Sequence, residues 1–122
     1  MRPKEKDREP QAPLTPAMFH VLLALADGDK HGYAILKEVA DRTSGKVQLS
    51  AGTLYGIIKR LDESGWILEK SHRPDIGFDD ERRRYYQLTE LGRRVAVAEA
   101  ARLEEMVEMA RAKRLVRKPR LA

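Results

Sequence analysis

The spacing of apolar residues changes twice along this chain of 122 residues, and these changes limit the folds open to it. Between Thr15 and Gly65, apart from a short alternating segment at residues 46–49, apolar side chains recur every three or four positions, which is typical of helices with one buried face. In residues 66–89 they alternate in two short runs around a polar segment, as in the strands of a β-hairpin. From Thr89 the helical spacing returns and continues to about residue 115. The sequence therefore predicts a mainly α fold with a small β-hairpin and one long C-terminal helix.

Capping residues and glycines define the ends of the predicted elements. Thr15, Ser50 and Thr89 each precede a helical pattern and can accept a hydrogen bond from its first turn. Glycines follow the first three helical patterns as C-terminal stops. The expected helices occupy residues 16–28, 31–45, 51–65 and 90–115, and the expected strands occupy residues 46–49, 66–70 and 82–89.

This order of elements is the plan of a winged helix-turn-helix domain, here residues 14–88. Two helices would pack against the third, and the hairpin that follows would form the wing. The third helix carries apolar residues at positions i, i+3, i+4 and i+7, which form a stripe facing the core. That stripe consists of Leu54, Ile57, Ile58 and Leu61.

The opposite face of the third helix combines residues that suit a DNA-recognition helix. Small residues let a helix backbone approach DNA, hydroxyls and cations bind phosphates, and longer side chains reach base edges. A glycine within a helix costs about 1 kcal/mol relative to alanine, so a merely solvated face seldom keeps one. Two alternatives stay open: Lys59 and Arg60 as ordinary solvated residues, and Tyr55 as part of the core. The candidate DNA contacts in this helix and its cap are Ser50, Gly52, Thr53, Tyr55, Lys59 and Arg60.

The last helix is too long to be covered by its own domain. About 27 helical residues at roughly 1.5 Å each span about 40 Å, whereas a compact domain of about 75 residues is on the order of 30 Å across. The overhanging part has apolar residues spaced alternately by four and three, and a symmetric homodimer is the commonest way to cover such a stripe. We therefore expect residues 89–115 to form a dimer interface that contains Ala96, Ala100, Leu103, Met106, Val107 and Ala110.

The formal net charge of +5 is unevenly distributed along the chain. The segment from Arg111 to Arg120 holds six basic residues and no acid, and residues 116–122 form a basic tail. Such clusters favour a polyanionic partner, although a basic tail can also serve only solubility. Residues 1–13 predict a disordered lead-in rather than a secretory signal. The lack of cysteine and of a long apolar run is consistent with a cytoplasmic protein without a membrane span.

Nothing in the sequence predicts an enzyme, a cofactor or a metal site. His20, His31 and His72 lie in different predicted elements, without the close spacing of metal ligands. No nucleophile elbow, phosphate-binding loop or dinucleotide fingerprint is present. The alternative to a DNA-binding regulator is a protein-interaction module that dimerises through its last helix without binding specific DNA, because a fold alone does not define a function.

Three segments together resemble the signature of PadR-type transcriptional regulators, within a similarity that runs from about residue 14 to 115. The segments are HGYAILKEV (31–39), LSAGTLYGIIKRLDESGWI (49–67) and RRRYYQLTELGRR (82–94). The resemblance implies a homodimeric winged-helix repressor that binds a palindromic operator in double-stranded DNA and is often released by a small molecule. It further implies that Tyr55 and Lys59 contact DNA and that Tyr33 lies near the DNA backbone. The motif after the wing, to which the resemblance assigns packing and capping, is matched by Tyr86, Leu88, Thr89 and Gly92.

The wing and the last helix depart from the pattern that the resemblance implies. The wing loop is acidic, whereas a loop on phosphate should be basic, so these acids are expected either to pair with residues 82–84 or to point away from DNA. The candidate phosphate contacts of the wing are His72, Arg73 and Arg83. The last helix has no Trp or Tyr to line an aromatic effector site, so an apolar effector site between the subunits is unsupported, and Trp66 and Met106 are the candidate contributors to one.

Overall fold

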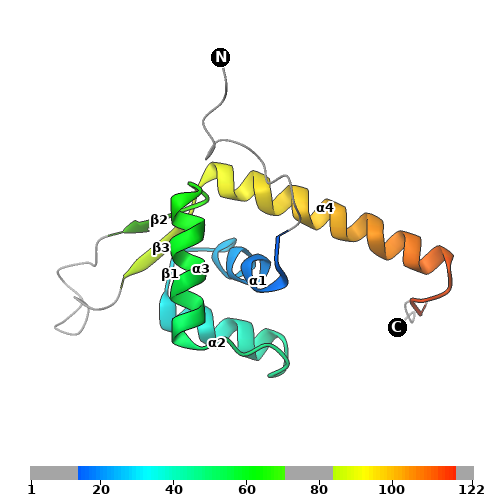
Figure 1. Cartoon of the computed structure of the whole chain (residues 1–122), viewed down its shortest axis with the longest axis horizontal. Coiled ribbons are helices and arrows are strands. Elements are labelled where there is room, and N and C mark those ends of the chain that lie inside the picture. The colour runs from blue at the N-terminus through cyan, green and yellow to red at the C-terminus, as the bar shows by residue number, and fades with distance from the viewer. Residues whose placement is uncertain (1–13, 71–83, 118–122) are drawn as a thin grey trace, which may run out of the picture.

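The computed structural model describes residues 14–70 and 84–117, whose strands form one antiparallel sheet in the order β1-β3-β2. The elements in chain order are α1 (Pro16–Leu25), β1 (Lys30–His31), α2 (Gly32–Arg42), α3 (Ala51–Glu63), β2 (Ile67–Lys70), β3 (Tyr85–Leu88) and α4 (Glu90–Ala112). The sheet lies beside α1 and α3, and α4 runs outward from the end of β3 (Figure 1). The helices and the β2–β3 hairpin confirm the predicted fold class.

The hydrophobic core surrounds α1, which contacts α2, α3, α4 and β3. Removing one apolar side chain fully from water stabilises the folded state by about 1.5–3 kcal/mol, so the apolar stripe of α3 holds this helix firmly against the rest of the domain. All members of the predicted stripe on α3 are buried, which confirms that prediction. The large side chains that are fully buried include Leu22, Leu25, Ile35, Leu54, Leu61, Ile67 and Val95.

Strand β1 was not among the predicted strands. Lys30 pairs with Tyr86 and His31 pairs with Tyr85, so β1 adds a third strand to the edge of β3. A strand of two residues has no periodicity of its own, and its position depends on a partner more than fifty residues further along the chain. Local sequence patterns therefore carry no signal for it.

The predicted strand at residues 46–49 is wrong, because this segment is irregular. Its backbone is held locally by the side chain of Thr43 instead of by a neighbouring strand. The Thr43 hydroxyl accepts a hydrogen bond from the Val47 N–H at 3.0 Å, and its oxygen also lies 3.4 Å from the Val47 carbonyl. Val47 and Leu49 still pack against the core, which explains why the segment alternates like a strand.

Several helices are shorter than predicted. α1 ends at Leu25, before Gly28, and α2 ends at Arg42 rather than near residue 45. α4 ends at Ala112 rather than at residue 115, because Arg114 adopts a left-handed φ of 64° that no α-helix can continue through. At about 1.5 Å per residue, its 23 residues still span about 35 Å.

The start of α4 is locked to the turn that follows α3. The Thr89 hydroxyl donates a hydrogen bond to the Gly65 carbonyl at 2.7 Å and accepts one from the Gly92 N–H at 2.9 Å. The Thr89 N–H donates to the Trp66 carbonyl at 3.0 Å. A Cβ atom at Gly92 would overlap that same carbonyl oxygen. The capping role that the resemblance implied for Thr89 is confirmed, and Gly92 is needed for this close approach.

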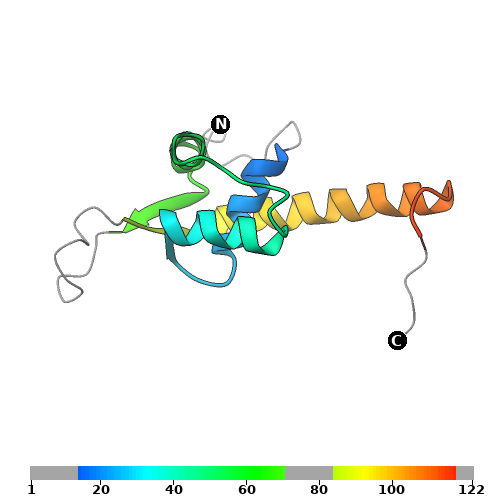
Figure 2. The ribbon, with the colours of Figure 1, turned by 90° about the horizontal axis from the view of Figure 1, so that it is seen from below.

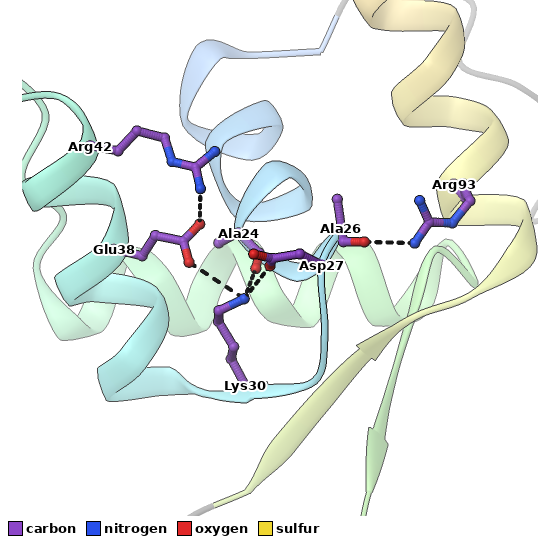
Figure 3. Close-up of polar contacts among 7 residues, drawn as sticks. All are labelled: Ala24, Ala26, Asp27, Lys30, Glu38, Arg42 and Arg93. Atoms are coloured by element: carbon purple, nitrogen blue, oxygen red, sulfur yellow. Dashed lines mark hydrogen bonds and ion pairs between the residues drawn. The ribbon is translucent and has the colours of Figure 1, made fainter.

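A cluster of charged side chains ties α1, β1 and α2 together (Figure 3). The Lys30 ammonium lies 2.5 Å from both the Ala24 carbonyl oxygen and an Asp27 carboxylate oxygen, and 3.4 Å from Glu38. Glu38 also pairs with Arg42 at 2.9 Å. Lys30 thus satisfies a carbonyl in the last turn of α1 and fixes how α1 meets α2.

Helix α4 has a covered half and an overhanging half (Figures 1 and 2). Its buried residues are Gly92, Val95 and Glu99, and from there to Ala112 every side chain is half-buried or exposed. Arg93 donates to the Ala26 carbonyl at 2.8 Å and so fastens the first half to the end of α1. Hydrogen bonds from Arg102 hold the pKa of the Glu99 carboxyl below its usual value. The remainder overhangs the domain by about 20 Å.

Replacing Gly92 with alanine should destabilise the whole domain. The added methyl group would force α4 away from the Trp66 carbonyl, and we expect a loss of roughly 2–3 kcal/mol in the free energy of unfolding, measured by urea denaturation. Gly56→Ala is the matched control, since a Cβ there meets nothing within 4 Å and should raise stability by about 0.5–1 kcal/mol. Equal unfolding midpoints for Gly92→Ala and the unchanged chain would show that the junction is not tight.

Candidate nucleic-acid interface

The exposed face of α3 gathers the candidate contacts that the sequence assigns to this helix and its cap. The Ser50 hydroxyl accepts a hydrogen bond from the Thr53 N–H at 3.1 Å and donates to the Thr53 hydroxyl at 2.9 Å. Hydroxyls, small residues and cations therefore lie on one surface of one helix. Its exposed members are Ser50, Gly52, Thr53, Tyr55, Gly56, Lys59 and Arg60.

The two glycines of α3 are not explained by packing within the chain. A Cβ atom built at Gly52 or Gly56 meets no atom within 4 Å, and neither residue has a positive φ. Both could be alanine without strain, and alanine would favour the helix by up to about 1 kcal/mol at each position. The glycines therefore leave a shallow, open backbone strip on the exposed face of α3.

The basic side chains on α3 differ from a lysine on the sheet in whether they form ion pairs. Within residues 14–70 and 84–117, Lys59 and Arg60 form no ion pair, so their charges face solvent. On the sheet, in contrast, Lys70 pairs with Asp29 at 3.1 Å. An unpaired cation on an exposed helix face is the kind that binds a phosphate at little cost.

The wing candidates His72, Arg73 and Arg83 lie outside the described residues, as does the acidic loop between them. The nearest described residue, Arg84, pairs with Glu69 on strand β2 at 3.3 Å. Arg84 therefore pairs with a glutamate on β2, the first strand of the hairpin.

Aromatic residues cluster where β1 meets α2, close to the exposed side of α3. Tyr33 is 70% exposed, and its ring stacks on His31 with centroids 6.4 Å apart. The His31 ring also meets the edge of Tyr85 at 5.6 Å, and His31 Nδ1 accepts the Ala34 N–H at 3.2 Å as the cap of α2. Sequence reasoning missed this role of His31, because it placed this residue inside the predicted helix 31–45.

Tyr55 lies between core and solvent, with 48% of its surface exposed. Its hydroxyl end rests against Gly32, where an added Cβ would stand 2.6 Å from the hydroxyl oxygen. Tyr86 is its buried neighbour on β3: burial raises the pKa of Tyr86 to about 12, and the nearby Glu69 and Tyr55 raise it as well. Tyr55 is therefore neither a core residue nor a fully solvated one.

The expected dimer residues lie along one side of α4, where little of the chain covers them. Met106 is 52% exposed and Val107 is 42% exposed, and Ala100 is also exposed. Leu103 and Ala110 are half-buried. Ala96 packs partly against the core of its own chain, so it has less surface to offer a partner.

Neither a metal site nor a membrane-spanning helix is found in the described parts of the chain. They contain no cluster of acidic or histidine side chains that could hold a metal ion, and none of their helices is long and apolar enough to cross a membrane. Trp66 is buried against the start of α4, whereas Met106 lies about 21 Å further along that helix. The two residues cannot line one effector pocket within a single chain.

Comparison with known proteins identifies the family of this chain. The family model described as the transcriptional regulator PadR-like family matches residues 21–98. A transcriptional regulator from Clostridium thermocellum has a similar structure, with a TM-score of 0.66 and 24% identity, over 78% of this chain and 86% of that one. A PadR family transcription regulator from Clostridium difficile also has a TM-score of 0.66, with 23% identity, over 78% and 94% of the two chains.

Two further relatives are more similar in sequence. BpsR of Bordetella bronchiseptica, whose DNA binding is regulated by 6-hydroxynicotinic acid, is 27% identical with a TM-score of 0.62, over 82% of this chain and 67% of that one. An uncharacterized protein of Lysinibacillus sphaericus is 29% identical over 92 residues, which cover 73% of this chain and 82% of that protein. The family match runs from the second half of α1 into the first half of α4 and includes the whole candidate recognition helix. The chain belongs to the PadR-like family of transcriptional regulators.

Proposed function

We propose that this chain is a homodimeric repressor that binds a palindromic operator in double-stranded DNA through α3. The observation that carries this proposal is the exposed face of α3, where Gly52 and Gly56 leave the backbone open and Lys59 and Arg60 lie beside them. A fold that needs neither glycine keeps both where a helix would enter the major groove. Such a regulator acts where the DNA is, in the cytoplasm.

The dimer would form through the overhanging half of α4. Residues such as Leu103 and Val107 gain little cover within one chain, although they are spaced like the seam of paired helices. Pairing with a second copy would bury this stripe around a two-fold axis and present two α3 helices to successive grooves, about 34 Å apart. A palindromic operator follows from that symmetry.

A small molecule would release the repressor from its operator. The support is the relative BpsR, whose DNA binding is regulated by 6-hydroxynicotinic acid. The identity of the effector need not be shared at 27% identity.

DNA binding can be tested by selecting duplexes from a random library with the full-length protein. We expect a palindromic sequence, bound at least a hundredfold more tightly than a scrambled duplex at about 100 mM salt. The affinity should fall steeply between about 50 and 200 mM salt, because several phosphate contacts release counterions. If a dimer forms but no sequence is enriched, the chain is instead a protein-interaction module that dimerises through α4.

The α3 glycines give a prediction in which stability and binding change in opposite directions. Gly52→Ala and Gly56→Ala should each raise the free energy of unfolding by about 0.5–1 kcal/mol. The same changes should weaken operator binding about tenfold or more, since the methyl group occupies the space that DNA needs. The selected duplex, titrated by fluorescence anisotropy, provides the measurement, and unchanged affinity in both variants would remove the clearance role of the glycines.

The α4 seam gives a separate prediction. Replacing Leu103 and Val107 together with aspartate should convert the dimer to a monomer, because two buried charges at the seam cost several kcal/mol. Light scattering at micromolar concentration measures the mass, and operator affinity should fall with it. The control is Val97→Asp, a residue of α4 that is 64% exposed and lies off the stripe. A double variant that stays dimeric would show that the subunits pair through another surface.

A further inference from the structure

The first residue of α2 determines how the recognition helix presents Tyr55. A Cβ atom at Gly32 would stand 2.6 Å from the Tyr55 hydroxyl oxygen, 3.1 Å from Cζ and 3.5 Å from Cε1. Real Cβ atoms do not approach other atoms within 3.0 Å, so the tyrosine can hold this position only while residue 32 lacks a side chain. Gly32 itself is buried under this ring.

The backbone of Gly32 does not need glycine for any other reason. Its φ is not positive, and it occupies the first position of a regular helix. The three atoms nearest to the added Cβ all belong to the far end of the Tyr55 side chain. Alanine at position 32 would therefore move one side chain and leave the fold intact.

The contact with Gly32 also fixes which part of Tyr55 faces outward. The hydroxyl end lies against the start of α2, and yet 48% of the residue is exposed. Because Cζ and Cε1 lie over Gly32 together with the hydroxyl, α2 covers one side of the ring, and the exposed surface includes its other side. A ring held in this way offers an apolar surface, which suits the methyl group of a thymine or the carbons of a deoxyribose rather than a hydrogen bond to a base edge.

We propose that Gly32 is a positioning residue for DNA recognition, which lays the Tyr55 ring along the protein so that its apolar surface contacts DNA. This inference rests on the proposed DNA-binding function and adds the residue that orients one contact. Gly32 touches no DNA itself in this scheme and acts only through Tyr55.

A double-mutant cycle on the full-length protein tests the proposal with the selected duplex as probe. Gly32→Ala should weaken binding about tenfold, which corresponds to the loss of one good contact. Tyr55→Phe keeps the ring and should bind within about threefold of the unchanged chain, whereas Tyr55→Ala should lose about tenfold. The double variant with alanine at both positions should bind no more weakly than Tyr55→Ala alone, because Gly32 has nothing left to position.

Two further measurements separate positioning from a general structural effect. The salt dependence of binding should keep the same slope in Gly32→Ala, since no phosphate contact is lost. In the free, unchanged protein, NMR should show a nuclear Overhauser effect between the Tyr55 ring protons and the Gly32 α-protons. Uracil in place of thymine in the probe distinguishes the two targets: it weakens the unchanged chain but not Tyr55→Ala if the methyl is contacted, and it changes neither if the sugar is contacted.

The outcomes that overturn the proposal differ from those that overturn DNA binding. If the unchanged chain selects no duplex, the proposed function fails and this inference fails with it. If the chain binds but Gly32→Ala binds equally well, or if the losses of Gly32→Ala and Tyr55→Ala multiply in the double variant, only the inference fails. It also fails if Tyr55→Phe loses as much as Tyr55→Ala, because the hydroxyl would then make the contact. The inference fails as well if Gly32→Ala lowers the melting temperature and the double variant keeps that loss, because Gly32 would then serve packing and not the position of Tyr55.

Discussion

The contact between the turn after α3 and the first turn of α4 determines how the functional parts of the chain are placed. Thr89 bonds to the backbone of Gly65 and Trp66, and Gly92 lets the helix backbone approach the Trp66 carbonyl. One end of this junction terminates α3, the candidate recognition helix, and the other begins the helix that overhangs the domain. These contacts, together with the packing of α4 against α1, set the direction of α4 relative to α3, and a methyl group at Gly92 would disturb them. In a dimer paired through α4, the same junction would set the distance between two recognition helices.

The two faces of helix α3 differ in what they contact: one packs in the core, and the other is exposed. The apolar stripe is buried in the core, so the exposed face, apart from the cap Ser50, is not needed for packing within the chain. Glycines that weaken the helix remain on that exposed face, where a Cβ would meet only open space. Residues that oppose local stability without any packing reason are typical of surfaces that meet a partner. Tyr55 sits at the border of the two faces and is held there from α2 rather than from its own helix.

Much of this fold could be predicted because its signals are local. The caps Thr15, Ser50 and Thr89 and the stop Gly65 act within one turn of the chain, and the structure confirms each of them. The stripe on α3 repeats with the period of the helix and is equally local. The strand at residues 46–49 was predicted wrongly because alternation alone does not reveal whether a side chain such as Thr43 already bonds the backbone. Strand β1 was missed because two residues carry no period.

The candidate site was predictable as a set of residues but not as an arrangement. The sequence by itself determined that α3 has a core face and a face of small, hydroxyl-bearing and basic residues, since helical geometry alone puts them on opposite sides. Only the tertiary structure decided that Gly32 lies under Tyr55, that the His31 ring packs edge-on with Tyr85, and that α4 passes close enough to Trp66 to require glycine. These contacts join residues on different elements, so they depend on how the elements pack against one another. A helical period reports what one helix buries, whereas the space left between two helices is decided only when both are in place.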